Sequence, residues 1–259
     1  MRILVTGDKG FIGGHLFRTL KRDGHEVFGY EPGDARPYVY NFDWVIHTGA
    51  ISSTTETNVE KIMRQNYDFS CELLDECIFR NVNFQFASSA SIYGLNREFK
   101  EDSPVDPRTP YSWSKYMFER YAFQQIRFAK HSVVQMFRYF NVYGSGEEHK
   151  GGQASPYAQF RIQKKQTGRI KLFVHSDKYY RDFIPVKDIV NYHRRFFEVE
   201  ESGLWNLGTG EVKSFYDVAK EIDAPIYYIP MPDNLKHSYQ EYTCADLTKL
   251  NKTLERYNA

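Results

Sequence analysis

The stretch TGDKGFIGG, residues 6–14, constrains the fold more than any other feature of this chain. It follows the apolar run RILV and precedes a segment with helical periodicity, so it lies between a strand and a helix. Glycine at Gly7, Gly10 and Gly13 lets the backbone turn tightly and approach a pyrophosphate, and the N-terminus of the next helix offers free N–H groups to that anion. This context favours a dinucleotide-binding site over a merely tight strand-to-helix turn.

The first half of the chain alternates strand and helix patterns. Such alternation predicts an α/β fold of the Rossmann type, a doubly wound parallel sheet. We expect residues 1–144 to form the dinucleotide-binding domain, with contributions from about 176–210, and 145–259 to form mainly a smaller C-terminal substrate-binding domain. The expected strands are 2–7, 25–31, 44–50, 82–90 and one beginning within 132–144, and the expected helices are 12–23, 57–80 and 110–129.

Glu31 ends the second predicted strand, 18 residues after Gly13. An acid at this position commonly binds the ribose hydroxyls of NAD, whereas the nearby Arg36 would pair with the 2′-phosphate of NADP, so the choice between NAD and NADP stays open. Only 12 residues separate Glu31 from Trp44, too few for a further helix and strand. We therefore expect the adenine end of the cofactor to be loosely covered.

Other cofactor contacts are expected from the ends of the neighbouring predicted elements. Ligands of such folds bind in the crevice beyond the carboxyl ends of the strands. Asn66, on the following helix, is a weaker candidate, because a solvated helix residue explains it equally well. The expected contacts at the two element ends are Phe11, Ile12, Thr48, Gly49 and Ala50.

Tyr111 and Lys115 form a Y-x-x-x-K pair near the start of the predicted helix 110–129. A spacing of four residues puts both side chains on one face of the helix. A free tyrosine, with a pKa of about 10, is a poor base at neutral pH, but a neighbouring ammonium stabilises its phenolate. Ser89 and Ser91, at the end of a predicted strand, would hold a substrate hydroxyl. We expect Ser89, Tyr111 and Lys115 to be catalytic rather than unrelated surface residues.

These motifs together resemble the extended short-chain dehydrogenase/reductase superfamily of NAD-dependent epimerases and dehydratases. More specific stretches, spread over nearly the whole chain, are similar to the ADP-L-glycero-D-manno-heptose 6-epimerases. Among them, the segments SSTTE and HKG best discriminate these enzymes from general sugar-nucleotide epimerases, which lack both segments. These stretches are HTGAISSTTE (47–56), RYFNVYG through EEHKGGQAS (138–155), RDFIPVKDI (181–189), WNLGTG (205–210) and YQEYTCADLTKL (239–250).

The resemblance implies a nucleotide-sugar epimerase that inverts C6 of an ADP-heptose by transient oxidation with bound NAD(P). Inversion needs an acid/base on each face of the carbon, and the second group would be Lys150 in the HKG loop; the alternative is a solvated loop lysine. A related reductase or epimerase–reductase, in which His149 or Lys150 protonates the substrate, remains open, as does a non-catalytic NAD(P)-binding protein.

The resemblance also implies further substrate contacts. Arg181 would bind the nucleotide diphosphate through a charge-assisted fork. For Phe173 and Tyr239, which would flank the nucleotide, core packing is an equally good explanation. Where the heptose epimerases usually have arginine before the YQ pair, this chain has Ser238. The remaining expected substrate contacts are Ser52, Ser53, Thr54, Ser91, Asn141 and His149.

Charge and cysteine content narrow the class of protein. Lys and Arg number 34 against 33 Asp and Glu, a balance that argues against nucleic acid as a partner. No apolar run approaches a membrane span, and we expect no membrane partner and no secretion signal. Three cysteines at irregular spacing predict reduced thiols, no metal site and a cytoplasmic location. The resemblance adds the expectation of a homo-oligomer.

Overall fold

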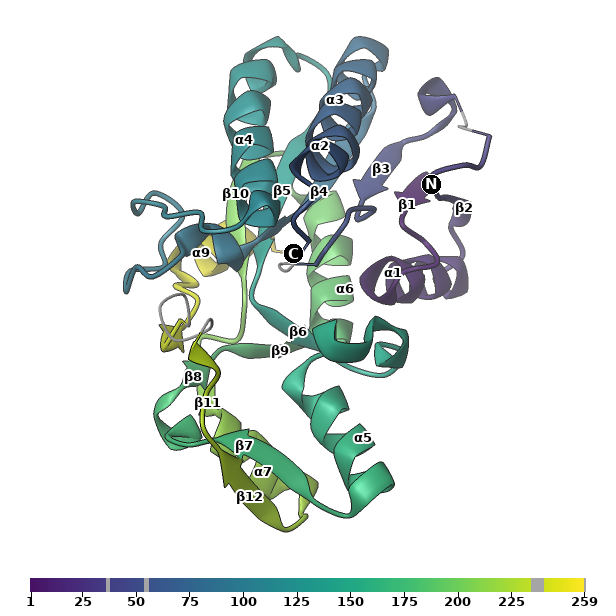
Figure 1. Cartoon of the computed structure of the whole chain (residues 1–259). Helices are drawn as coiled ribbons and strands as arrows, with labels where there is room; N and C mark the ends of the chain where they lie inside the picture. The colour runs from purple at the N-terminus through teal and green to yellow at the C-terminus, as the bar shows by residue number, and fades with distance from the viewer. Residues whose placement is uncertain (36–37, 54–55, 234–239, 259) are drawn as a thin grey trace.

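The computed structural model describes residues 1–35, 38–53, 56–233 and 240–258 (Figure 1). Its centre is a six-stranded sheet in the order β10-β5-β4-β3-β1-β2, in which every neighbouring pair is parallel. This confirms the predicted Rossmann-type α/β fold. The six strands are β1 (Arg2–Thr6), β2 (Glu26–Tyr30), β3 (Trp44–His47), β4 (Asn83–Ser89), β5 (Val134–Tyr139) and β10 (Gly203–Leu207).

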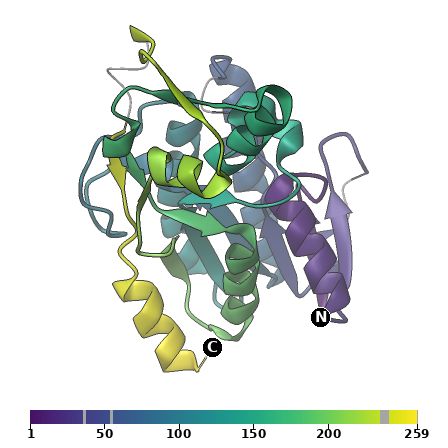
Figure 2. The ribbon, with the colours of Figure 1, turned by 90° about the horizontal axis from the view of Figure 1, so that it is seen from below.

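Helices cover both faces of this sheet (Figure 1). On one face α1 packs against α6, and on the other α3 packs against α4. Figure 2 shows α1 beside β2 at one edge of the sheet and α9, in yellow, beside the other edge, where it contacts β10. The bounds are α1 (Phe11–Arg22), α2 (Val59–Ile62), α3 (Phe69–Arg80), α4 (Pro110–Gln125), α6 (Val186–Arg195) and α9 (Thr248–Tyr257).

The helical run predicted at 57–80 contains an irregularity that its apolar pattern does not indicate. A π-helical segment, η2 (Met63–Asp68), joins α2 to α3. The wider turn shifts the phase of the helix by about one residue, so side chains beyond it face directions that a regular helix would not give them. Asn66 lies inside this segment and is fully buried.

A smaller unit lies below the sheet in Figure 1 and has an apolar core of its own, centred on Tyr157, Phe160, Leu172 and Val218. In it, β7 pairs with β12, and β8 lies between β11 and β13. Short strands β6 and β9 connect it to the sheet. The bounds are β6 (Asn141–Tyr143), α5 (Pro156–Thr167), β7 (Ile170–Phe173), β8 (Tyr180–Arg181), β9 (Phe183–Pro185), β11 (Lys213–Ser214), α7 (Phe215–Ile222), β12 (Ile226–Ile229) and β13 (Tyr242–Thr243).

At two places the strands differ in extent from the sequence patterns. The strand at 44–50 ends at His47, and the pattern at 132–144 divides into β5 and β6 around Phe140. The division arises because the backbone changes partners: Phe140 N donates to Leu207 O, but Asn141 N donates to Asp182 O. This change of partner directs the chain from the large sheet into the smaller unit.

The short segment after Glu31 behaves as predicted. In its described part it contains a 3-10 turn, η1 (Val39–Asn41), and an isolated bridge between Pro32 and Asp34, and β2 forms the edge of the sheet.

The cysteines Cys71, Cys77 and Cys244 are not joined in disulfides. Within the described ranges no group of acidic, histidine and cysteine side chains is arranged to hold a metal ion. None of the helices there combines the length and apolar character needed to cross a bilayer.

Candidate active site

The glycine turn after β1 forms a cradle of backbone. Gly7 has φ +76°, and a Cβ on it would lie 2.7 Å from Gly49 N. A Cβ on Gly13 would lie 2.0 Å from Gly7 O. The N-cap residue of α1, Gly10, has no side chain to bond the first N–H groups, and the first turn of the helix holds no acid. A bare, positively polarised helix end beside close-packed glycines fits the pyrophosphate of a dinucleotide.

A cavity of about 400 Å³ continues from this cradle toward the edge of the sheet. Glu31 lines it, and its carboxylate accepts a hydrogen bond of 2.9 Å from Lys9 N in the glycine turn. Tyr30 stacks on Phe69 with ring centroids 5.8 Å apart. Of the expected cofactor contacts Gly7, Gly49 and Ala50 also line the cavity. Sequence analysis missed the others that do so: Thr6, Tyr30, Pro32, Ile51, Arg64, Gln65 and Phe69.

Thr48 and Asn66 hold backbone in place at this cavity. Thr48 Oγ1 donates to Thr6 O at 2.7 Å. The carboxamide of Asn66 accepts from Ile51 N at 2.8 Å and donates to Ile51 O at 3.0 Å, so it fixes the loop that follows β3. Asn66 also donates to Ser114 Oγ on α4. Instead of lying in solvent, its side chain supports the cavity wall through Ile51.

Ser89, Tyr111 and Lys115 come together at the carboxyl end of β4. Thr109 and Ser112 form a capping box at the start of α4, which fixes where the helix begins and therefore where Tyr111 lies. Lys115 Nζ donates to Ala87 O at 2.7 Å and lies 5.9 Å from the Tyr111 ring centroid. Ser89 acts on the Tyr111 phenol and opposes the rise of its pKa, and Ser89 Oγ accepts from Ser91 N at 3.2 Å.

Burial shifts the ionisation of both members of the Tyr/Lys pair. It raises the pKa of Tyr111, which the interaction with Ser89 partly opposes. It lowers the pKa of Lys115 to about 7, and the carboxylate of Glu119 opposes this shift. In both cases burial disfavours the charged form of the side chain. In the free protein the site therefore favours a neutral phenol at Tyr111 and eases loss of the proton of Lys115.

Lys150 lies in the 3-10 segment η5 (Glu148–Gln153), above the glycine turn. Its Nζ is 5.3 Å from the ring centroid of Phe11, the first residue of α1. Burial lowers the pKa of Lys150, and Glu147 opposes this shift. The buried Glu147 carboxylate accepts from Gly144 N at 3.1 Å and from Ser155 N at 2.6 Å, which closes the base of the loop. The Lys150 side chain is thus half-buried and lies against Phe11, while His149 is exposed.

Two of the expected nucleotide contacts, Phe173 and Arg181, lie in the smaller unit. Phe173 lines a cavity of about 470 Å³ with Tyr179, Phe215 and Ser176, whose buried hydroxyl has no hydrogen-bond partner. The guanidinium of Arg181 donates to Tyr180 O and Gln240 O and lies 5.4 Å from the Phe215 ring centroid.

The other expected substrate contacts lie in several environments. Asn141 is half-buried at the start of β6, and Ser53 is half-buried in the loop after β3, where Ser52 is exposed. The Ser91 hydroxyl is buried without a partner. Thr54 and Tyr239 lie outside the described residues, as does Arg36.

Three solved structures are similar to this chain over almost their whole length. An ADP-L-glycero-D-manno-heptose-6-epimerase from Helicobacter pylori is 22% identical with a TM-score of 0.79, and the match covers 100% of this chain and 96% of that one. A UDP-N-acetylglucosamine 4-epimerase from Methanobrevibacter ruminantium is 21% identical, with coverage of 97% and 91% and a TM-score of 0.86. A UDP-glucose 4-epimerase from Thermus thermophilus, solved with NAD, is 25% identical, with coverage of 100% and 99% and a TM-score of 0.80.

The model of one protein family matches residues 3–208, which include the glycine turn, Ser89, the Tyr/Lys pair and Lys150. The match spans most of the chain and agrees with the parallel sheet, the glycine cradle and the buried Tyr111/Lys115 pair. The predicted superfamily and the nicotinamide dinucleotide cofactor are thereby confirmed. The chain belongs to the NAD dependent epimerase/dehydratase family.

Proposed function

We propose that this protein inverts a carbinol centre of a nucleotide sugar, C6 of an ADP-heptose, by transient oxidation with bound NAD(P). The observation that carries the proposal is the position of Lys150, whose amine lies against Phe11 at the cofactor cradle. A second proton-transfer group at that place suits inversion, because the two configurations present their hydroxyls to different sides of the site.

The bound nicotinamide would accept hydride from the substrate carbon and return it. Tyr111 would remove the hydroxyl proton, and the Lys115 ammonium would stabilise the phenolate. Ser89, which acts on the Tyr111 phenol, would hold the same substrate oxygen. Donors that are held before the reaction lose little energy to reorganisation when charge develops on that oxygen.

Lys150 would serve the opposite configuration after the ketone has turned over. A free lysine stays protonated at neutral pH, but burial lowers the pKa of Lys150, which makes proton release easier. A 4,6-dehydratase is a poorer fit, because it would need an acidic pair beside the active-site hydroxyl. Here Ser89 is followed by Ala90 and Ser91.

The sugar nucleotide would extend from this centre into the smaller unit. Arg181 would bind its diphosphate, with Phe173 and Tyr239 beside the base. The sugar would contact the loops after β3, β4 and β5. The residues proposed there are Ser52, Ser53, Thr54, Ser91, Asn141 and His149.

We further propose a cytoplasmic homo-oligomer that binds neither nucleic acid nor a membrane. The support for assembly is a set of exposed apolar side chains on α3 and α4, namely Phe79, Trp113, Met117 and Phe123. Exposed apolar side chains gathered on adjacent helices are typical of protein interfaces.

The proposed function is tested with purified protein, ADP-heptose and NAD(P), following the configuration at C6 by NMR. Inversion without net consumption of reduced cofactor is the expected result. Stoichiometric consumption of NADPH would instead identify a reductase. Absence of turnover with either cofactor would favour a non-catalytic NAD(P)-binding protein.

Replacing Lys150 by alanine is expected to lower the rate of inversion about 100-fold or more while leaving the affinity for the dinucleotide unchanged. The reason is that the variant loses one of two proton-transfer groups but no part of the glycine cradle. Lys165→Ala, an exposed lysine on α5, is the matched control and should retain full activity. An unchanged inversion rate in Lys150→Ala would refute the second acid/base role.

We expect kcat/KM to rise with pH along an acid limb whose apparent pKa is about 7, the value for Lys115. Below that pH the Tyr111/Lys115 pair holds both protons, so Tyr111 cannot accept another. Loss of the first proton leaves one proton shared by the pair, and the rate levels off. The profile is measured over roughly pH 5 to 9, because kcat/KM reports ionisations of the free enzyme. Lys115→Met should abolish this limb; a limb that persists would contradict the assignment.

A further inference from the structure

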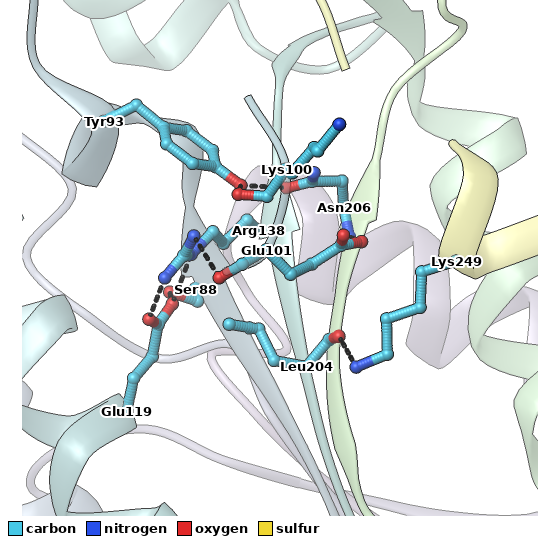
Figure 3. A network of polar contacts seen from close by, with 9 residues as sticks. All are labelled: Ser88, Tyr93, Lys100, Glu101, Glu119, Arg138, Leu204, Asn206 and Lys249. Carbon is cyan, nitrogen blue, oxygen red and sulfur yellow. Dashed lines mark hydrogen bonds and ion pairs between the residues drawn. The ribbon is translucent and has the colours of Figure 1, made fainter. Parts of the chain in front are cut away.

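A buried ion pair lies one helical turn beyond the Tyr/Lys pair (Figure 3). Glu119 Oε2 is 2.7 Å from Arg138 Nη2, and Glu119 Oε1 accepts from Arg138 Nε at 3.0 Å. The side chains are 1% and 3% exposed. Removing two charges from water costs several kcal/mol per ion, and an apolar pair of similar size often packs equally well. The pair therefore calls for an explanation other than stability.

The carboxylate of this pair is tied to the strand that carries the catalytic groups. Ser88 Oγ donates to Glu119 Oε1 at 2.5 Å. On one side of Ser88 in the chain is Ala87, whose carbonyl accepts from Lys115 Nζ, and on the other is Ser89, which acts on the pKa of Tyr111. Three consecutive residues of β4 thus interact with Lys115, Glu119 and Tyr111.

The helix supplies a second connection. Glu119 follows Lys115 by four residues, so the two side chains lie on the same face of α4. Glu119 is the acid whose charge acts on Lys115 and partly offsets the effect of its burial. Arg138 supplies the opposite charge and forms the ion pair with the buried carboxylate.

The other charged and titratable groups near this centre come from α4, β5, the 3-10 turn η3 (Ala90–Tyr93) and the loop at Glu101. They are Tyr111 on α4, Tyr139 on β5, Tyr93 in η3, whose ring centroid lies 4.7 Å from the Arg138 guanidinium, and Glu101, whose backbone oxygen accepts from Arg138 Nη1. Burial raises the pKa of Tyr93 and of Tyr139, so both phenols are neutral at pH 7. Burial also raises the pKa of Glu101, whose carboxylate interacts with Arg138. The carboxylate that acts on Lys115 is that of Glu119, and Arg138 is its ion-pair partner.

We propose that Glu119 and Arg138 are positioning residues for the catalytic base: they hold a partly compensated negative charge behind β4 and so set how much positive charge Lys115 keeps at neutral pH. This rests on the proposed function only in naming Tyr111 as the base. The charge on Lys115 is measurable without any substrate, so failure of this inference and failure of the epimerase proposal are distinguishable.

The test is a pH titration of Lys115 by NMR in full-length protein labelled with ¹³C at lysine Cε, with Lys115→Arg used to assign the signal. Glu119→Gln removes the anion and leaves the cation of Arg138, so the midpoint should fall by about one pH unit. Arg138→Met removes the cation that competes for Glu119, so the midpoint should rise. A role in packing alone would not produce shifts of opposite sign.

Two further variants guard against misfolding and non-specific effects. The double variant Glu119→Gln/Arg138→Met leaves no unpaired buried charge and is expected to fold. Its midpoint should still fall, because Glu119 is the member of the pair tied to Lys115. The fall should be smaller than in Glu119→Gln, because the cation of Arg138 is removed as well. Arg120→Gln, an exposed charge on the same helix, should leave the midpoint unchanged because solvent screens it. An unchanged midpoint in the double variant, or shifts of the same sign in the two single variants, would overturn the proposal.

Discussion

Replacing Tyr111 by phenylalanine is expected to lower turnover by about 100- to 10,000-fold, the range usual for loss of a general acid–base group. The variant removes one hydroxyl from a half-buried ring and leaves the glycine cradle and Lys115 in place. Thermal unfolding and dinucleotide affinity should therefore match those of the wild type. Single-turnover kinetics with ADP-heptose provide the measurement, because they isolate the chemical step from product release.

The matched control for this prediction is Tyr116→Phe. Tyr116 lies on the same helix and belongs to a separate cavity of about 990 Å³ between α4, residues 100–105 and α9. That cavity is larger than the one beside the glycine cradle; Glu119 and Arg138 line it, but Ser89, Tyr111, Lys115 and Lys150 do not. We expect Tyr116→Phe to retain activity. If Tyr111→Phe also retained it, the catalytic base would have to be sought elsewhere.

Replacing Gly13 by alanine is expected to abolish measurable dinucleotide binding and to lower the free energy of unfolding by about 1–3 kcal/mol, typical of an overpacked site. The added Cβ would lie 2.0 Å from Gly7 O and 2.7 Å from Thr48 Oγ1. Because Gly7 O belongs to the turn that approaches the pyrophosphate, relief of this clash must deform the cradle itself. Titration with NAD(P) and thermal unfolding measure the two effects separately.

Gly14 is the control, since it is the next residue of the same helix. A Cβ there would meet the flexible end of Arg18 at 3.0 Å and Asp8 O at 3.2 Å. The side chain of Arg18 can move, and alanine is the better helix former by about 1 kcal/mol. We therefore expect Gly14→Ala to bind the dinucleotide with normal affinity. Equal loss of binding in both variants would show that the effect of Gly13→Ala is not specific to the cradle.

Features encoded in short stretches of sequence were predicted correctly. The apolar run before Gly7 and the glycine spacing after it indicated the first strand, the turn and α1. The 12 residues between Glu31 and Trp44 indicated that the sheet would lack a further strand at that edge, and β2 is the edge strand. Residues four apart on a helix share a face whatever surrounds it, so Tyr111 and Lys115 were certain to lie together once the helix formed.

Features that depend on distant partners were not predictable in this way. The division of the 132–144 pattern into β5 and β6 depends on Asp182 O, which replaces Leu207 O as the acceptor. The π-helical segment that turns Asn66 inward has no signature in the apolar pattern, and so Arg64, Gln65 and Phe69 were missed as cavity residues.

By itself, then, the sequence determined the Rossmann-type architecture, the cofactor turn and the Tyr/Lys pair, because each depends on periodicity or spacing within a few residues. Only the tertiary structure decided that Lys150 lies against Phe11 and that Glu119 is paired with Arg138 behind β4. Those contacts join residues 139 and 19 positions apart in the chain. Burial then alters their charge, and burial is a property of the packed protein rather than of any short stretch of it.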